Sequence, residues 1–300
     1  KTGLDEDAGY AIETDRYTLL AVFDGMGGMG SRCFVTMRNL SSAYLASHFY
    51  ARVLEKDFFR CLQEGCFDGT FNYAKHLGAL FTNEGQYVKK RFLDQEPSSI
   101  VGSMVKALPS TAAIALVNKE SNHCIFIWAG DSRGYFLSEN GLYQLTNDNV
   151  KMPQNAFDSL YRDAPMNNFI NADKPFKLFS RGITTKRPGV FLVATDGAFA
   201  CLPSPMHFEG LLLNALAKSK DSEDWLLHVK ADLLPQANDD VTVAIQPVGF
   251  ESHDAMKSAL DKRRQYLERT FLLSRPGGMD IQSLRDTWQK YHTEMYGTSS

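Results

Sequence analysis

The most regular feature of this chain is a set of short, uniformly apolar segments rich in β-branched residues. These segments show little alternation between apolar and polar positions, which is typical of β-strands covered on both faces. Residues 135–145, with Asn140-Gly141 at their centre, predict a β-hairpin. The five apolar segments predicted as strands are Tyr17–Phe23, Thr111–Val117, Cys124–Trp128, Val190–Ala194 and Val241–Ile245.

Apolar residues at helical spacing predict helices between and after these strands. In the first of them, Phe34, Tyr44 and His48 fall on one helical face. The order of strands, long helices, more strands and further helices favours an α+β fold over a regular βαβ alternation, with a sandwich of sheets inside and helices outside. The predicted helices span residues 34–48, 73–88, 206–216 and 225–234.

The pattern changes after residue 250, where two helical stripes are separated by Arg275–Gly278. These stripes predict a C-terminal helical hairpin. Because a large exposed apolar patch is unfavourable, we expect the hairpin to pack on the main body or on a partner. The residues that carry this expectation are Tyr266, Phe271, Trp288 and Tyr291. We therefore divide the chain into a main domain, 1–250, and a C-terminal helical extension, 251–300.

Composition narrows the class of protein. With 300 residues, 44% of them hydrophobic, the chain can bury a large core. The net charge of −3, with acidic and basic residues mixed along the chain, argues against nucleic acid or an anionic membrane as a partner. No apolar run approaches the ~18 residues that span a bilayer, and the five cysteines fall in no disulfide or zinc spacing. We therefore expect a soluble, cytoplasmic protein.

Aspartates stand at the ends of four predicted strands. Asp24, Asp131 and Asp196 each follow an apolar segment, and Asp239-Asp240 precedes another. A single Asp-Gly pair after a strand is usually only a turn, because Gly tolerates positive φ. Several carboxylates converging at one end of a sandwich would repel one another unless they were protonated or neutralised by cations. Since Mg²⁺ and Mn²⁺ prefer oxygen ligands, the pattern predicts a site for such a cation.

Six short motifs follow one another in the chain: Phe23–Gly28, Ser110–Ala112, Ala129–Arg133, Leu145-Thr146, Ala194–Gly197 and Asp239–Thr242. Each motif alone is a weak signal. Their order and spacing, over residues 3 to 248, resemble the type-2C metal-dependent serine/threonine protein phosphatase family, in particular its bacterial branch. The resemblance implies a central antiparallel β-sandwich flanked by helix pairs, with metals at one end of the sandwich.

The resemblance also implies a ligand set for two divalent cations, Mn²⁺ or Mg²⁺. Asp24 would bridge the two cations, and the Gly25 carbonyl and the Glu6 carboxylate would contact one of them. Asp196 and Asp239 would hold the other. The implied catalytic residues are the three aspartates of this set, Asp24, Asp196 and Asp239. Adjacent residues at a strand start point to opposite faces, so Asp240 is expected to face away from the metals.

Further roles follow from the same resemblance. Asp131, together with Asp196, would hold a weaker third cation, and Asp7 would support the site through bound water. The implied reaction is hydrolysis of phosphoserine or phosphothreonine in a protein, by attack of a water shared between the two cations. The implied partners are a phosphorylated protein substrate and an opposing serine/threonine kinase.

Departures from the family pattern leave an alternative open. The arginine that grips the substrate phosphate in the family is replaced by Thr2, so Lys1 or another cation would have to take over. Many eukaryotic members have a general-acid histidine at the position of Met26. The methionine at this position is similar to the bacterial branch. The alternative function is a pseudophosphatase that acts as a regulatory or binding module. Substrate choice is expected to depend on the C-terminal hairpin and on residues 147–187, a long surface excursion with weak periodicity.

Overall fold

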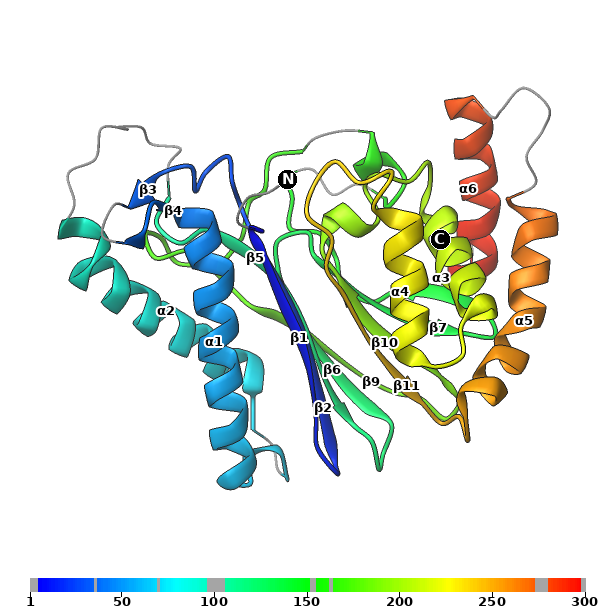
Figure 1. The fold of residues 1–300 in the computed structure, drawn as a ribbon, viewed down its shortest axis with the longest axis horizontal. Coiled ribbons are helices and arrows are strands. Elements are labelled where there is room, and N and C mark those ends of the chain that lie inside the picture. The colour runs from blue at the N-terminus through cyan, green and yellow to red at the C-terminus, as the bar shows by residue number, and fades with distance from the viewer. Residues whose placement is uncertain are drawn as a thin grey trace.

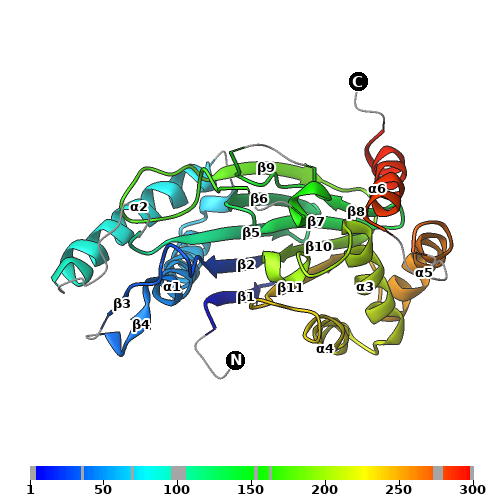
Figure 2. The same ribbon diagram turned by 90° about the horizontal axis from the view of Figure 1, so that it is seen from above.

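The computed structural model describes residues 5–34, 37–68, 71–95, 106–151, 155–161, 164–272 and 280–297. Two β-sheets pack face to face in the centre, and helices cover both outer faces (Figure 1). The view from above separates the layers, with α1 and α2 beside one sheet and α3 to α6 beside the other (Figure 2). The predicted α+β sandwich is confirmed. No helix in the described part of the chain is long and apolar enough to cross a membrane.

The first sheet has five strands in the order β1-β2-β5-β6-β9, and the second has four in the order β11-β10-β7-β8. All neighbouring strands run antiparallel. The first sheet comprises β1 (Asp7–Glu13), β2 (Tyr17–Gly25), β5 (Ser110–Asn118), β6 (His123–Ala129) and β9 (Phe179–Thr184). The second comprises β7 (Arg133–Ser138), β8 (Gly141–Gln144), β10 (Gly189–Ala194) and β11 (Val243–Val248). A small ribbon pairs β3 (Cys33–Phe34) with β4 (Leu40–Ser41).

The helices are α1 (Ser42–Gln63), α2 (Tyr73–Arg91), α3 (Pro205–Lys218), α4 (Ser222–Leu233), α5 (His253–Thr270) and α6 (Ile281–Tyr296). Short 3-10 turns span Cys66–Asp68, Leu93–Gln95, Asp158–Leu160 and Asp196–Ala198. Apolar residues form three clusters, one between the sheets and one under the helices on each side. Because β2, β5 and β10 contribute to clusters on both of their faces, their sequences are apolar throughout rather than alternating.

The five predicted strands are all present, with one difference at the last. Strand β11 begins at Val243, two residues after its predicted start, so Asp239 and Asp240 lie in the preceding loop. The prediction that these two side chains alternate across a strand was therefore wrong. The predicted hairpin is β7-β8, but Ser138 lies opposite Gly141, so its two turn residues are Glu139 and Asn140.

Sequence reasoning missed four strands, β1, β3, β4 and β9, and misplaced the start of one helix. Strands β1 and β9 lie at the edges of their sheet and expose part of their residues, so neither has the apolar signature of the inner strands. The stripe predicted as a helix from residue 34 is helical only from Ser42, where Ser41 accepts a hydrogen bond from the Tyr44 backbone N–H as an N-cap. Phe34 instead belongs to β3.

The C-terminal helices α5 and α6 lie side by side and share the core cluster beneath α3 and α4 (Figure 1). The expectation that the hairpin packs on the body is confirmed for Phe271, Trp288 and Tyr291, which are buried. It was wrong for Tyr266, which is 44% exposed. The predicted helix break at Arg275–Gly278 lies outside the described residues. The division of the chain at residue 250 stays a prediction.

A buried charge network fixes the hairpin to the body. The Arg263 side chain of α5 donates to both carboxylate oxygens of Glu209 on α3, at 2.6 and 3.2 Å. The Tyr291 hydroxyl of α6 donates a short hydrogen bond to the same carboxylate. Glu209 is fully buried, so these partners offset the cost of removing its charge from water. The network therefore orients α5 and α6 relative to α3.

Candidate metal centre

The aspartates predicted to form a site meet at one end of the sandwich. Asp24 lies at the end of β2, directly opposite Asp7 at the start of β1. Asp196 follows β10, Asp131 lies in the turn between β6 and β7, and Asp239 lies in the loop before β11. The charge of Asp24 is influenced by all four other carboxylates. Segments that are far apart in the sequence therefore bring these side chains together.

Burial raises the pKa of Asp24 well above its usual range, and the neighbouring carboxylates raise it further. Burial also raises the pKa of Asp196, with Asp239 adding to the shift. The Asp24 and Asp196 carboxyl groups are close enough to hydrogen-bond to each other. Two carboxylates at that separation need either a shared proton or a cation between them. The pair is thus suited to bridging or shared coordination of a cation.

Asp7 lies behind this pair and connects the two sheets. Its Oδ2 atom accepts hydrogen bonds from the hydroxyls of Thr195 and Thr242, each at 2.8 Å. Burial raises the pKa of Asp7 to about 7, although the two threonines act in the opposite direction. Because β1 belongs to one sheet and the threonines flank strands of the other, Asp7 holds the two sheet ends in register. The two threonines were not predicted as part of the site.

Glu6 is held in place by three contacts around it. Its Oε1 atom accepts a hydrogen bond from the Ser41 hydroxyl at 2.6 Å, and its carbonyl accepts one from the Gly25 backbone N–H at 3.0 Å. Its own backbone N–H donates to Oδ2 of Asp240 at 2.7 Å. A side chain at Gly25 would overlap the Ala43 carbonyl oxygen, so only glycine allows this approach. Glu6 is therefore positioned next to the end of β2, as the predicted ligand set requires.

The contact made by Asp240 was missed by sequence reasoning. Asp240 was expected to point away from the site, yet its carboxylate binds the backbone of Glu6 and adds to the raised pKa of Asp7. Its carbonyl lies so close to Gly197 that any side chain there would collide with it. Both residues of the Asp239-Asp240 pair therefore face the cluster, with Asp239 next to Asp24 and Asp196. The two adjacent aspartates were visible in the sequence. The prediction that they start a strand, and so point to opposite faces, placed Asp240 on the wrong side.

Asp131 provides an independent test of whether a cation fits. Its Oδ1 atom is buried and has no hydrogen-bond partner among the described residues. Burial raises the pKa of Asp131 to about 7, with contributions from Asp196 and Asp148. A buried carboxylate oxygen normally finds a partner, so an unpaired one next to other carboxylates is chemically suited to a cation. The residues present therefore fit an oxygen-coordinated divalent metal.

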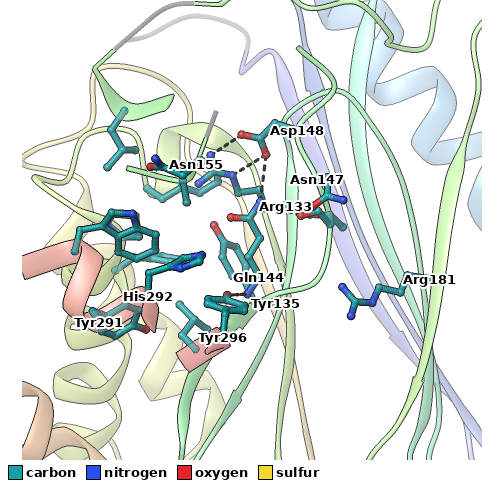
Figure 3. Close-up of a pocket in the computed structure, with 18 residues that line it drawn as sticks. Arg133, Tyr135, Gln144, Asn147, Asp148, Asn155, Arg181, Tyr291, His292 and Tyr296 are labelled. Carbon is teal, nitrogen blue, oxygen red and sulfur yellow. Dashed lines mark hydrogen bonds and ion pairs between the residues drawn. The ribbon is translucent and has the colours of Figure 1, made fainter. Parts of the chain in front are cut away.

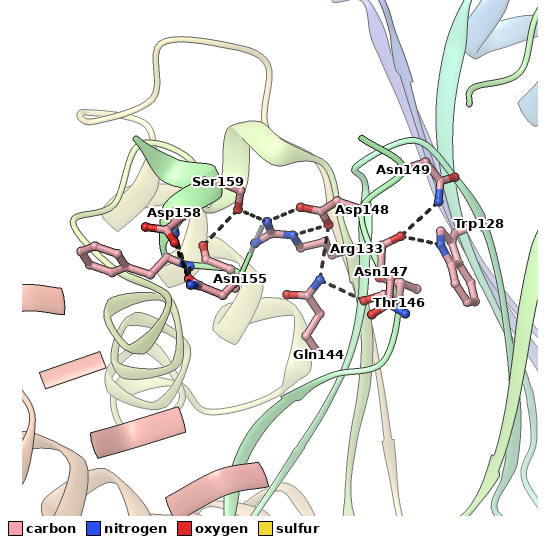
Figure 4. Close-up of polar contacts among 12 residues, drawn as sticks. Trp128, Arg133, Gln144, Thr146, Asn147, Asp148, Asn149, Asn155, Asp158 and Ser159 are labelled. Atoms are coloured by element: carbon pink, nitrogen blue, oxygen red, sulfur yellow. Dashed lines mark hydrogen bonds and ion pairs between the residues drawn. The ribbon is translucent and has the colours of Figure 1, made fainter. Parts of the chain in front are cut away.

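A cleft of about 370 Å³ opens beside Asp131 and Asp196. Its wall includes Arg133, which is buried and forms a two-point ion pair with Asp148 at 2.9 and 2.6 Å (Figure 3 and Figure 4). The same guanidinium donates to the Ser159 hydroxyl at 2.7 Å and lies 4.1 Å from the centre of the Phe199 ring. Arg133 belonged to a motif, whereas Asp148 and Ser159 lie in the excursion and carried no sequence signal.

Comparison with known proteins places the fold. No protein-family model and no curated protein sequence matches the chain. Among solved structures, it resembles a bacterial serine phosphatase at 16% identity, with a TM-score of 0.59, over 82% of this chain and 92% of that one. It also resembles the serine/threonine phosphatase PstP/Ppp of Mycobacterium tuberculosis at 18% identity, with a TM-score of 0.58, over 83% and 93%. A third neighbour is the serine/threonine phosphatase Stp1 of Staphylococcus aureus, at 19% identity, with a TM-score of 0.58, over 82% and 89%.

The chain has the fold of bacterial serine/threonine phosphatases. The resemblance inferred from six short motifs is thus confirmed at the level of fold. At these identities the likeness concerns the fold alone, so the chemistry has to be argued from the side chains of this chain.

A second cluster, outside the aspartate site, has metal-ligand geometry. In the described part of the chain, the ligand atoms of Asp57, Cys61 and His76 all lie within 4.8 Å of one another. The Arg60 guanidinium already occupies this cluster, 2.6 Å from Asp57 Oδ1 and 3.1 Å from His76 Nε2. A fixed positive charge between the donors makes the cluster an ion-pair network. Among the residues that the structure describes, no three of the strand-end carboxylates form such a tight group.

Proposed function

We propose that the chain is a metal-dependent phosphatase that removes phosphate from phosphoserine or phosphothreonine in proteins. The observation that carries the proposal is the meeting of carboxylates from five separate chain segments at one end of the sandwich. A purely structural role would not favour this arrangement, because the cluster is strained by mutual repulsion without a cation. The fold, shared with bacterial serine/threonine phosphatases, supports the same reading.

The proposed ligands are those implied by the sequence motifs. Asp24 would bridge two Mn²⁺ or Mg²⁺ ions, Glu6 and the Gly25 carbonyl would contact one, and Asp196 and Asp239 would contact the other. Support comes from the raised pKa of Asp24 and from its proximity to both other aspartates. A bound pair of divalent cations lowers the pKa of water and offsets charge on phosphoryl oxygens.

Asp131, with its unpaired Oδ1 atom, is the proposed anchor of a third, weaker cation. The protein itself contributes orientation and charge. Asp7, Thr195 and Thr242 hold the ends of both sheets together, so that the carboxylates keep their spacing. The family position of the phosphate-gripping arginine, Thr2, lies outside the described residues, as does Lys1.

Among the described residues that line the cleft, Arg133 is the one cation. Its ion pair with Asp148 fixes the buried guanidinium and offsets its charge. We propose that Arg133 positions the wall of the cleft beside Asp131 and Asp196. We also propose that residues 1–250 carry the phosphatase activity. The proposed substrate is a cytoplasmic phosphoprotein that an opposing serine/threonine kinase has modified.

Turnover of an aryl phosphate and of a serine phosphopeptide, each measured with Mn²⁺, Mg²⁺ or excess chelator, tests the proposal. We expect metal-dependent hydrolysis that is lost in Asp24→Asn and retained in Asp15→Asn. Asp15 is a matched control because it is an exposed aspartate in the turn at the other end of the β1-β2 hairpin. Calorimetric Mn²⁺ binding without turnover of either substrate would instead establish the pseudophosphatase alternative.

A further inference from the structure

A second, larger hollow adjoins the aspartate cleft. It has a volume of about 530 Å³ and lies between strands β7 and β8, the segment around Asn155 and helix α6 (Figure 3). We call it the α6 pocket. The two hollows share four wall residues, Arg133, Asp148, Leu160 and Phe199. A ligand seated at the aspartates therefore has the α6 pocket as its immediate neighbour.

The walls of the α6 pocket are largely aromatic. Helix α6 contributes four rings, and strand β7 and helix α3 add Tyr135 and Phe208. The rings from α6 belong to Trp288, Tyr291, His292 and Tyr296. Side-chain amides of Gln144, Asn147 and Asn155 lie among them (Figure 3). A hollow of this size, with apolar rings and a few polar groups, suits a planar aromatic group with a polar edge.

The pocket is held in its shape by contacts on both sides of α6. Arg285 of α6 forms an ion pair with Asp158 at 3.0 Å, which ties the helix to the segment that forms one wall. At the other end of the helix, the Tyr296 hydroxyl accepts a hydrogen bond from the Gln144 backbone N–H at 2.8 Å. Helix α6 of the C-terminal extension is therefore tied both to the excursion, through Asp158, and to strand β8, through Gln144.

The rim of the pocket carries a positive charge. Arg181 projects from edge strand β9 and is exposed, and its guanidinium has no hydrogen bond or ion pair to any of the described residues (Figure 3). The other arginine of the pocket, Arg133, is already paired with Asp148. A carboxylate near the aromatic group would therefore find an available partner at Arg181.

We propose that the α6 pocket binds an aromatic side chain of the phosphoprotein substrate, located a few residues from the phosphorylated residue and next to an acidic one. The proposal rests on the proposed function. An extended peptide advances about 3.3 Å per residue, so one short segment can reach from the aspartate cleft into the adjoining pocket. Because the two hollows share a wall, the arrangement favours such a peptide over a free aromatic metabolite, which would gain nothing from binding next to the aspartates.

Pairs of phosphopeptides that differ only by Trp or Ala at one position, scanned along an acidic peptide, test this proposal. For the wild type with Mn²⁺, we expect kcat/KM to be about tenfold higher for the Trp peptide at one or two positions. Ala156→Trp, which fills the pocket, and His292→Ala, which removes part of its wall, should each bring the ratio close to one. Tyr87→Ala, an exposed aromatic on α2, should keep the wild-type ratio.

Binding of the same peptides, measured by fluorescence anisotropy with the metals chelated, separates this proposal from catalysis. Aromatic preference in binding that is lost in Ala156→Trp supports the pocket even if the protein turns over no phosphoester. Hydrolysis of an aryl phosphate without any peptide preference overturns the pocket proposal and leaves the proposed function standing. A preference that survives in both pocket variants, with unchanged melting temperatures, also overturns it. An equal loss of turnover in the pocket variants on the aryl phosphate and on both peptides would overturn the pocket proposal too. The same is true of saturable binding of free indole compounds without any peptide preference.

Discussion

Neutralising one aspartate of the cluster should stabilise the metal-free protein. Asp24 lies among four other carboxylates in a largely desolvated setting, and Asp24→Asn removes one of the repelling charges while keeping the shape of the side chain. If the aspartates only formed turns, the same substitution would be neutral or destabilising. The sign of the effect therefore discriminates between a cation site and a set of structural turns.

Two neighbouring buried carboxyl groups give the scale of the effect. The pKa of Asp7 and of Asp131 rises from 3.8 to about 7, which corresponds to roughly 4 kcal/mol of lost stability per group above pH 7. The pKa of each group is higher in the folded protein than in the unfolded chain. The folded protein therefore loses no stability from these groups below pH 3.8, and it loses progressively more as the pH rises to about 7. At pH 5 the corresponding loss is only about 1.5 kcal/mol. Burial is also the first cause of the raised pKa of Asp24, so Asp24→Asn should relieve a cost of the same order, about 2 to 4 kcal/mol at pH 8 and less at pH 5.

Thermal unfolding with chelator and with Mn²⁺ is the assay. In a chain of 300 residues, 1 kcal/mol shifts Tm by about 1.5 °C, so the variant should melt about 3 to 6 °C above the wild type in chelator at pH 8. Mn²⁺ at ~100 times its Kd should stabilise the wild type by about 2.7 kcal/mol, or about 4 °C, and the variant far less. Asp15→Asn should follow the wild type. A variant that melts lower in chelator, together with a wild type that Mn²⁺ does not shift, would refute the convergent site.

Three further predictions concern catalysis and the hairpin. Asp239→Asn should slow turnover by about two orders of magnitude or more, which corresponds to at least ~2.7 kcal/mol of barrier. Asp240→Asn should slow turnover less, because Asp240 acts through the backbone of Glu6. A larger loss for Asp240→Asn in steady-state kinetics would contradict this prediction. Chelation should abolish activity and thiol alkylation should leave it unchanged, since the proposed nucleophile is water; full activity in excess chelator would contradict the metal dependence. Arg263→Ala should destabilise the protein by about 3 to 5 kcal/mol in urea unfolding, because the buried charge of Glu209 loses its main partner. Arg264→Ala is the matched control, because among the described residues this partly buried arginine pairs only with Asp261 and Glu268 of its own helix, and it should change stability by less than about 1 kcal/mol.

The inner strands and the aspartates at their ends were accessible to sequence reasoning because both signals are local. A strand buried on both faces must be apolar throughout, as β2, β5 and β10 are, and a polar residue at its tip stands out against that background. The edge strands β1 and β9 gave no such signal, since one side of each strand is unpaired and several residues face solvent. The roles assigned to individual ligands remain predictions.

The sequence by itself determined that the chain forms a sandwich with carboxylates at the strand ends. The tertiary structure decided which of them meet, because contacts such as that between Glu6 and Asp240 join residues 234 positions apart and depend on how the two sheets pack. The same holds for the partners of Arg133 and for the α6 pocket, whose walls come from strands β7 and β8, the excursion, helix α3 and the C-terminal helix α6. Local patterns encode strands and helices, but only long-range packing places one segment's side chains against another's.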